Sequence, residues 1–165
     1  WGHASPPPKQ RRKAGNTVPS KEQVKERTKT LLRRWGPRII ALYWVKWATQ
    51  TAVAYLDLVP KQLAWVDSFT PIPLWSWWAM CAGLLLLGAI VPPCAGPRAQ
   101  DVARYLRVAG VGLIALALCV WTIVFYAEQP RGWVSGKNYE LAFFAAAASA
   151  WALGRNQVGG KQVKP

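Results

Sequence analysis

Residues 74–91 and 108–127 decide the fold, and they read LWSWWAMCAGLLLLGAIV and VAGVGLIALALCVWTIVFYA. Neither stretch contains a charged residue, and a helix of either length, at about 1.5 Å per residue, approaches the thickness of the hydrocarbon core of a bilayer. Trp75, Trp77 and Trp78 lie near the start of the first stretch, and tryptophan is enriched where a helix meets the membrane–water interface. We predict that both stretches cross a membrane and that the three tryptophans form an interfacial belt.

Residues 39–59 form a third apolar stretch, which is long enough to cross a membrane but is interrupted by polar side chains. Lys46, Gln50 and Asp57 are spaced by four and seven residues, so a helix presents them on one face. This polar face fits a helix that lies on the membrane surface. It equally fits a spanning helix whose polar side meets other helices. The sequence leaves both alternatives open.

Residues 139–154 form the last apolar stretch, which is short and rich in alanine. Small residues recur along one of its faces, where the backbone of another helix can approach closely. This predicted helix-packing stripe consists of Ala142, Ala146, Ala150 and Gly154. An alanine-rich helix gains little by facing lipid, so we expect it inside a bundle.

These stretches together predict an all-α protein with a helical transmembrane bundle over residues 37–155. The bundle has four spans, or three if residues 39–59 lie on the membrane surface. A disordered, basic, proline-rich arm at residues 1–19 and a basic amphipathic juxtamembrane helix at residues 20–36 precede it. A short basic tail follows at residues 156–165. The four predicted spans are residues 39–59, 74–91, 108–127 and 139–154.

The ends of the juxtamembrane helix are predicted from local signals. Ser20 and Gln23 have the spacing of a capping box, in which each side chain bonds to the backbone N–H of the other residue. The pair Gly36-Pro37 is a stop signal, because proline lacks the backbone N–H that a continuing helix needs. We therefore expect this helix to end before the first span begins.

Positive charge is concentrated at the start of the chain. Residues 1–38 contain 11 of the 21 lysines and arginines, and the formal net charge of the whole chain is +14. Such a segment attracts anionic lipid headgroups or nucleic-acid phosphates, or acts only as a topology signal. The apolar positions beside the basic ones favour lipid over nucleic acid. The predicted lipid or phosphate contacts are Lys9, Arg11, Arg12, Lys13, Lys25, Lys29, Arg33 and Arg34.

The basic residues of the connecting segments also predict the orientation. Cytoplasmic segments carry an excess of lysine and arginine. With four spans, the basic arm, the predicted loop at 92–107 and the tail all lie on the same side. With three spans, that loop and the tail are forced to the opposite side from the arm. The charge count thus favours four spans in a bacterial inner membrane or its equivalent, with both termini cytoplasmic.

The sequence contains no pattern that indicates an enzyme. The serine-hydrolase elbow, the Walker phosphate loop, the zinc motif HExxH and the dinucleotide-binding glycine motif are all absent from it. Its three cysteines and one histidine have no metal-ligand spacing. We predict a protein without catalytic residues, metal or cofactor.

Residues 130–155, PRGWVSGKNYELAFFAAAASAWALGR, and the plan of a basic start, a few tight spans and a short basic end resemble small membrane proteins of tailed phages. Holin-like proteins of lysis cassettes belong to this group. The resemblance implies a protein that oligomerises in the inner membrane and permeabilises it on schedule.

Two other functions remain compatible with the sequence. The chain could be a non-catalytic accessory subunit of a larger membrane assembly, with its basic arm bound to a partner or to anionic lipid. It could also carry ions or protons by means of Lys46, Gln50 and Asp57. We rank the permeabilising homo-oligomer first, the accessory subunit second and the carrier third.

Overall fold

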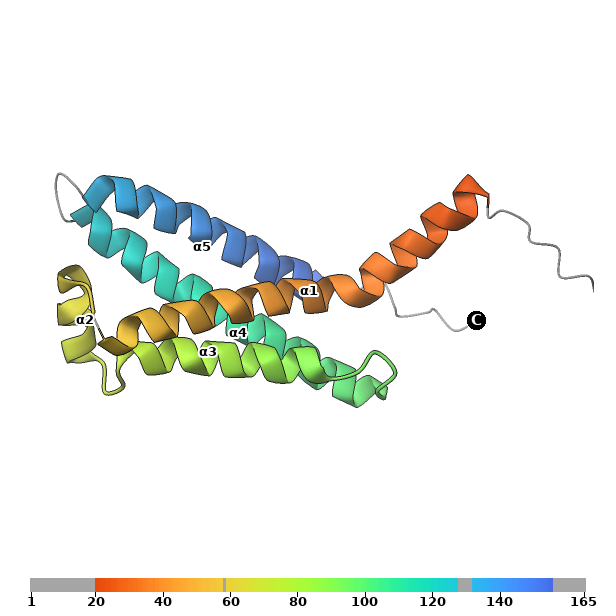
Figure 1. Ribbon diagram of the computed structural model, residues 1–165, viewed down its shortest axis with the longest axis horizontal. Coiled ribbons are helices and arrows are strands. Elements are labelled where there is room, and N and C mark those ends of the chain that lie inside the picture. The colour runs from red at the N-terminus through yellow and green to blue at the C-terminus, as the bar shows by residue number, and fades with distance from the viewer. Residues whose placement is uncertain (1–19, 58, 128–131, 156–165) are drawn as a thin grey trace, which may run out of the picture.

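The described part of the chain is built from helices. The computed structural model describes residues 20–57, 59–127 and 132–155, and these ranges contain no strand. The long helices α1 (Lys21–Asp57), α3 (Leu74–Ile90), α4 (Pro97–Ala127) and α5 (Gly132–Arg155) run alternately in opposite directions (Figure 1). A short 3-10 helix, η1 (Lys61–Leu63), and α2 (Ala64–Phe69) lie between α1 and α3. The predicted all-α class is therefore confirmed.

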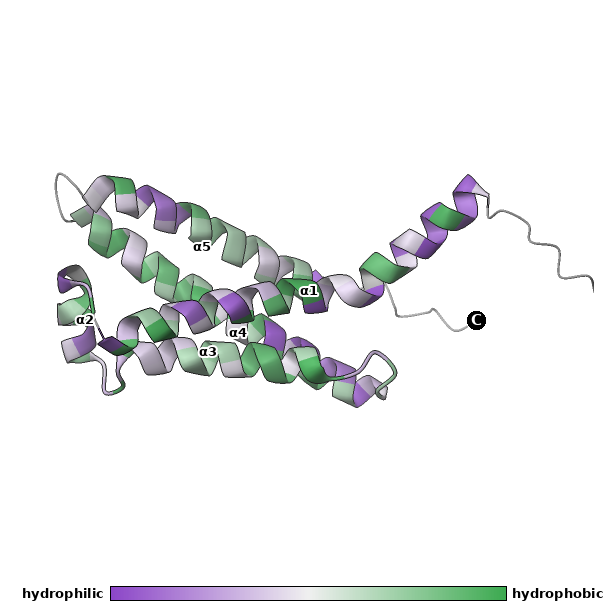
Figure 2. Ribbon diagram, in the orientation of Figure 1, coloured by the Kyte–Doolittle hydropathy of each residue, from purple (hydrophilic) through white to green (hydrophobic). Residues whose placement is uncertain are grey.

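The long helices pack in chain order. The second half of α1 lies along α3, α3 packs against α4, and α4 packs against α5 (Figure 1). The first part of α1 leaves the bundle at an angle and extends beyond it. Figure 2 shows that hydrophilic residues dominate this projecting part, whereas hydrophobic residues dominate α3.

A chain of aromatic rings links the long helices through the core. The ring centroid of Trp78 on α3 lies 5.4 Å from the ring centroid of Trp47 on α1. It lies 4.9 Å from the ring centroid of Trp121 on α4. Trp121 in turn lies 5.3 Å from Tyr139 on α5. Aromatic pairs of this kind contribute about 0.5–1.5 kcal/mol each beyond the burial of their surface. Trp78 is completely buried against the neighbouring helices, whereas Trp75 of the same predicted belt is 40% exposed.

Two glycines allow α3 and α4 to approach each other closely. A Cβ atom on Gly88 of α3 would lie 2.7 Å from the Cγ atom of Arg107 and 2.8 Å from the carbonyl oxygen of Ala103. A Cβ atom on Gly110 of α4 would lie 2.7 Å from the Cγ atom of Leu85. Since atoms in proteins do not pack at such distances, any side chain at these positions would push the helices apart.

The start of α1 agrees with the sequence, but its predicted end is wrong. The backbone N–H of Ser20 donates to Oε1 of Gln23, and the backbone N–H of Gln23 donates to Oγ of Ser20, both at 3.3 Å, which confirms the capping box. Gly36-Pro37 does not stop the helix, because α1 continues through Pro37 to Asp57. Arg38 ties the following turn to the bundle by donating to the carbonyl oxygens of Arg34, at 3.1 Å, and Val91. These bonds offset the one that proline cannot make.

The last two long helices begin earlier than the sequence predicted. The loop expected over 92–107 ends at Gly96, and α4 starts at Pro97, because proline fits the first turn of a helix, where no N–H is needed. α5 begins at Gly132 instead of residue 139. Its first turns pack on the end of α4, where Gly136 lies against the Tyr126 ring and the Tyr126 hydroxyl donates to Glu140 at 2.5 Å.

One helix of the described part, α4, is both long and apolar enough to cross a membrane. α3 is apolar but has 17 residues, and α1 carries the polar face. The length and composition of one helix, α4, thus support an association of the chain with a membrane. The number of spans stays a prediction.

The glycine contacts generate a stability prediction. Replacing Gly88 or Gly110 by alanine forces a Cβ atom into the α3–α4 contact, so we expect the free energy of unfolding to fall by about 1–3 kcal/mol. Thermal unfolding followed by circular dichroism in one detergent measures the loss.

Gly83 and Gly112 serve as matched controls on the same two helices, because a Cβ atom there meets nothing within 4 Å. Alanine at these positions should leave stability unchanged or raise it by up to about 1 kcal/mol, since alanine favours a helix over glycine. Equal effects at all four glycines would contradict the proposed role of the close contact.

Candidate functional site

The outward face of α1 brings together the polar residues that the sequence placed on one helix face. Lys46, Gln50 and Asp57 are all exposed on the side of α1 opposite its buried face, and Thr49 is exposed beside them, at the edge of α1 that meets α3. We call these four residues the polar face of α1. The buried side of the same helix carries Ala41, Trp44, Ala48, Ala52 and Tyr55, which pack into the core.

Apolar residues surround the polar face. Ile39, Leu42 and Val53 are more than half exposed on the same side of α1. At about 1.5 Å per residue, Lys46 lies roughly 12 Å and Gln50 roughly 18 Å along the helix from Arg38. Polar groups therefore lie halfway along a largely hydrophobic surface, and no other residue of the described ranges covers them.

Arginines collect at the end of the bundle where α3 and α5 finish. A helix ends in carbonyl oxygens that lack partners and that carry the negative end of the helix dipole. Arg107 of α4 donates to the carbonyl oxygen of Gly88 at 3.1 Å, and Arg38 of α1 donates to that of Val91. Arg104 donates to the carbonyl oxygen of Gly154 at 2.6 Å. The three guanidinium groups thus hold α1 and α4 against the ends of α3 and α5.

Two of these arginines are buried without an acidic partner. Arg107 is 6% exposed and Arg38 is 8% exposed, and no acid of the described ranges lies within salt-bridge distance of either. Arg107 precedes the apolar stretch 108–127. Burial, and secondarily the positive charge of Arg38, lowers the pKa of the Arg107 guanidinium from its usual value. Backbone carbonyl oxygens are therefore the groups that stabilise these charges.

We call Arg38, Arg104 and Arg107 together the arginine end. The sequence did not predict this cluster, because its three residues lie on two different helices. Arg104 and Arg107 were counted as loop charges that set the orientation, and Arg38 was counted with the basic segment before the first span. A signal was present: Arg107 follows Arg104 by three residues, so a helix continued backwards from residue 108 places both on one side. Their carbonyl acceptors become visible only when the helices are packed.

The predicted lipid or phosphate contacts fall partly on the projecting part of α1. Lys25, Lys29 and Arg34 are exposed there, at positions beyond the bundle. The apolar side chains of Val24, Leu31 and Trp35 are exposed beside them. Lys9, Arg11, Arg12 and Lys13, the basic tail and the side chain of Arg33 lie outside the described residues.

The small-residue stripe of α5 is used within the chain. Ala146 is completely buried, and Ala142 and Ala150 are partly buried against the same core. Gly154 ends the stripe near Arg104, and a Cβ atom there would meet nothing within 4 Å. Because the core occupies most of this face, a second copy of the chain would have to bind a different surface.

The described ranges contain no group of three histidine, cysteine, aspartate or glutamate side chains that could hold a metal ion. Cys81 is buried, Cys94 is exposed and Cys119 is half-buried, and none of the three forms a disulfide. The polar face and the arginine end are thus the two places in the described part where polar groups gather.

Comparisons of this chain with known proteins identified no related protein. No family model matches the chain, and neither a curated protein nor a solved structure matches it.

The arginine end generates a second prediction. Replacing Arg107 by methionine keeps much of the packing but removes the donor to Gly88, so a buried carbonyl oxygen loses its partner. We expect a loss of about 1–3 kcal/mol in the free energy of unfolding, measured by thermal unfolding in detergent. Arg98→Met is the control, because Arg98 is exposed on the same helix and its loss should change stability by less than about 0.5 kcal/mol. An equal loss in both variants would show that net charge, and not the bond to Gly88, is responsible.

Proposed function

We propose that this chain is an integral membrane protein with four spans that oligomerises through the polar face of α1 and permeabilises the membrane. The observation that carries the proposal is the outward position of Lys46 and Gln50, halfway along α1 and beside exposed apolar residues such as Leu42 and Val53. Charged and amide groups inside a bilayer almost always face other helices or a water-filled cavity. The described part of a single copy covers neither group, and an assembly of copies that surrounds water would satisfy both.

The alternating direction of the four long helices supports the proposal of four spans. The arginine end collects the ends of α3 and α5, the start of α4 and the part of α1 nearest its projecting segment. An excess of arginine and lysine belongs on the cytoplasmic side. We therefore place the arginine end and both termini in the cytoplasm, and the α2 end on the opposite side of an inner membrane.

A third prediction tests the permeabilising function. Inducible expression in a bacterial host, recorded as membrane potential and culture density, should give abrupt depolarisation after a delay. The double variant Lys46→Leu/Gln50→Leu makes the face apolar and should abolish the depolarisation. Val53→Leu is the matched control, because Val53 is exposed on the same side of α1 and stays apolar. Depolarisation that persists in the double variant would refute the proposed role of the face.

A cysteine-labelling experiment tests whether water reaches the face. In a chain whose native cysteines are replaced by serine, Gln50→Cys should react with a membrane-impermeant thiol reagent added to cells. Leu116→Cys on α4 provides the comparison, because Leu116 is equally an outward residue, 55% exposed, but lies on an apolar surface. It should remain unlabelled. Equal labelling at both positions would argue against a water-filled assembly lined by α1.

The second candidate function is a non-catalytic accessory subunit. The projecting part of α1 favours it, because exposed Val24, Leu31 and Trp35 lie beside exposed Lys25 and Lys29 and make no contact with the bundle that would bury them. Such a helix suits an acidic partner or an anionic lipid surface. Normal growth with the protein stably inserted, together with copurification of another chain at fixed stoichiometry, would favour this function over permeabilisation.

A further inference from the structure

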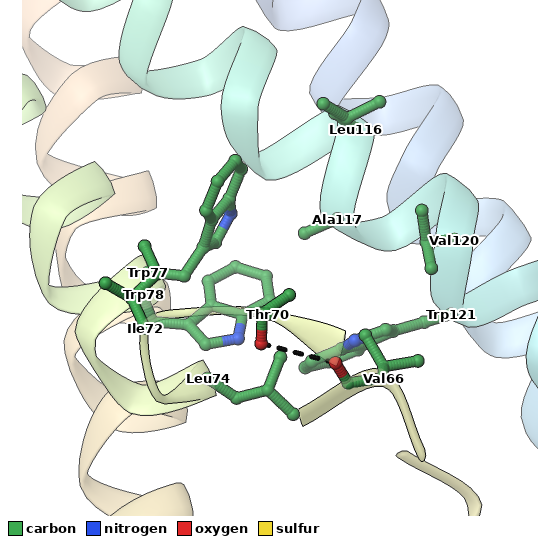
Figure 3. A pocket seen from close by; sticks show the side chains of 10 residues that line it. All are labelled: Val66, Thr70, Ile72, Leu74, Trp77, Trp78, Leu116, Ala117, Val120 and Trp121. Atoms are coloured by element: carbon green, nitrogen blue, oxygen red, sulfur yellow. Dashed lines mark hydrogen bonds between the residues drawn. The ribbon is translucent and has the colours of Figure 1, made fainter. Parts of the chain in front are cut away.

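A cavity of about 150 Å³ lies between α2, α3 and α4, at the end of the bundle opposite the arginines. Figure 3 shows Trp77 and Trp78 of α3 on one side of it and Leu116, Ala117 and Val120 of α4 on the other. Its walls are almost entirely apolar. A space with this lining suits an apolar group better than water.

Two hydrogen-bond donors at the cavity have no acceptor. The indole N–H groups of Trp77 and Trp78 are both buried, and neither has a partner in the described part of the chain. Trp78 is itself 0% exposed. The hydroxyl of Thr70, which also lines the cavity, donates to the carbonyl oxygens of Val66 (Figure 3) and Asp67, both at 3.2 Å, and accepts from neither indole. A buried indole N–H normally finds a partner, so an acceptor is missing from this place.

The position of the cavity along the helices narrows the choice of ligand. α3 begins at Leu74, whose backbone N–H is capped by Asp67 at 3.0 Å, and Trp77 and Trp78 follow about 4.5–6 Å further along the helix. Trp65 and Phe69 of α2 are exposed at the same end, as aromatic side chains are at a membrane–water interface. In the orientation proposed above, this is the depth at which the ester carbonyls of phospholipids lie above their acyl chains.

The cavity also has a path from the lipid. Its outer rim carries Ile72 and Leu116, which are 43% and 55% exposed. Both are apolar and lie on the outside of the bundle, so a hydrocarbon chain can enter between them without crossing a polar surface.

We propose that this cavity binds one acyl chain of a membrane phospholipid, whose ester carbonyl oxygen accepts a hydrogen bond from the indole N–H of Trp77 or Trp78. The methylene groups fill the apolar space, and the ester supplies the missing acceptor. The proposal rests on the membrane insertion proposed above, but it requires neither oligomerisation nor permeabilisation.

A fourth prediction compares ester-linked with ether-linked lipids. The full chain, labelled with ¹⁵N, is placed in nanodiscs of diacyl phosphatidylcholine or of the dialkyl analogue, which lacks the carbonyl oxygens. The indole ¹H–¹⁵N signals are assigned with Trp77→Phe and Trp78→Phe. We expect at least one of the two signals to lie downfield in the diacyl discs. Identical signals in both lipids would overturn the proposal.

Filling the cavity provides a second variant. Ala117→Leu occupies the space and should remove the difference between the lipids, whereas Ala54→Leu, at an exposed position on α1, should preserve it. Circular dichroism checks that both variants remain helical. If Ala117→Leu fails to fold, the wild-type comparison decides the question on its own.

Three outcomes separate the possible explanations. A downfield shift produced in ether-lipid discs by added free palmitic acid, and absent with diacyl lipid, would overturn the assignment to a phospholipid. A chain that enters the discs but shows no difference between lipids overturns the lipid site and leaves the permeabilising proposal intact. A chain that does not enter discs at all overturns both.

Discussion

The close contact between α3 and α4 is the constraint on which the rest of the structure depends. Because Gly88 and Gly110 have no side chains, the two helices approach until Arg107 reaches the carbonyl oxygen of Gly88. The same approach brings the rings of Trp78 and Trp121 to 4.9 Å. α1 is then held on α3 by Trp47, and α5 on α4 by Tyr139, so the aromatic core and the arginine end share one geometric origin.

Local signals in the sequence predicted local structure well. The capping box at Ser20 was predicted because both its partners lie within one turn, and the limits of α3 were predicted because nothing competes with an uncharged apolar stretch between prolines. The apolar lengths of the other helices marked their cores but missed their polar ends. A helix can continue through polar residues such as Arg104, whose side chain reaches a carbonyl oxygen of another helix. The length of an apolar stretch does not predict such an extension.

Tertiary contacts explain the predictions that were wrong. Gly36-Pro37 predicted a stop because an interior proline loses one hydrogen bond, at a cost of about 3 kcal/mol. Arg38 supplies bonds that offset part of this cost, one to Arg34 within the same helix and one to Val91, a residue distant in sequence. Trp78 and its neighbour Trp75 look alike in the sequence, yet one is buried and the other exposed. Of the candidate site, the spacing of Lys46, Gln50 and Asp57 predicted a shared face, but whether that face points inward or outward depends on which side of α1 receives α3.

The arginine end also has a consequence for the order in which the protein is made. The last carbonyl oxygens of α3 receive one donor from α1, which is synthesised before α3, and one from α4, which is synthesised after it. While a ribosome has completed only α1 and α3, Arg38 can already bind Val91, but Gly88 has no partner. A hairpin of α1 and α3 alone therefore leaves the Gly88 carbonyl oxygen without the arginine donor that α4 brings.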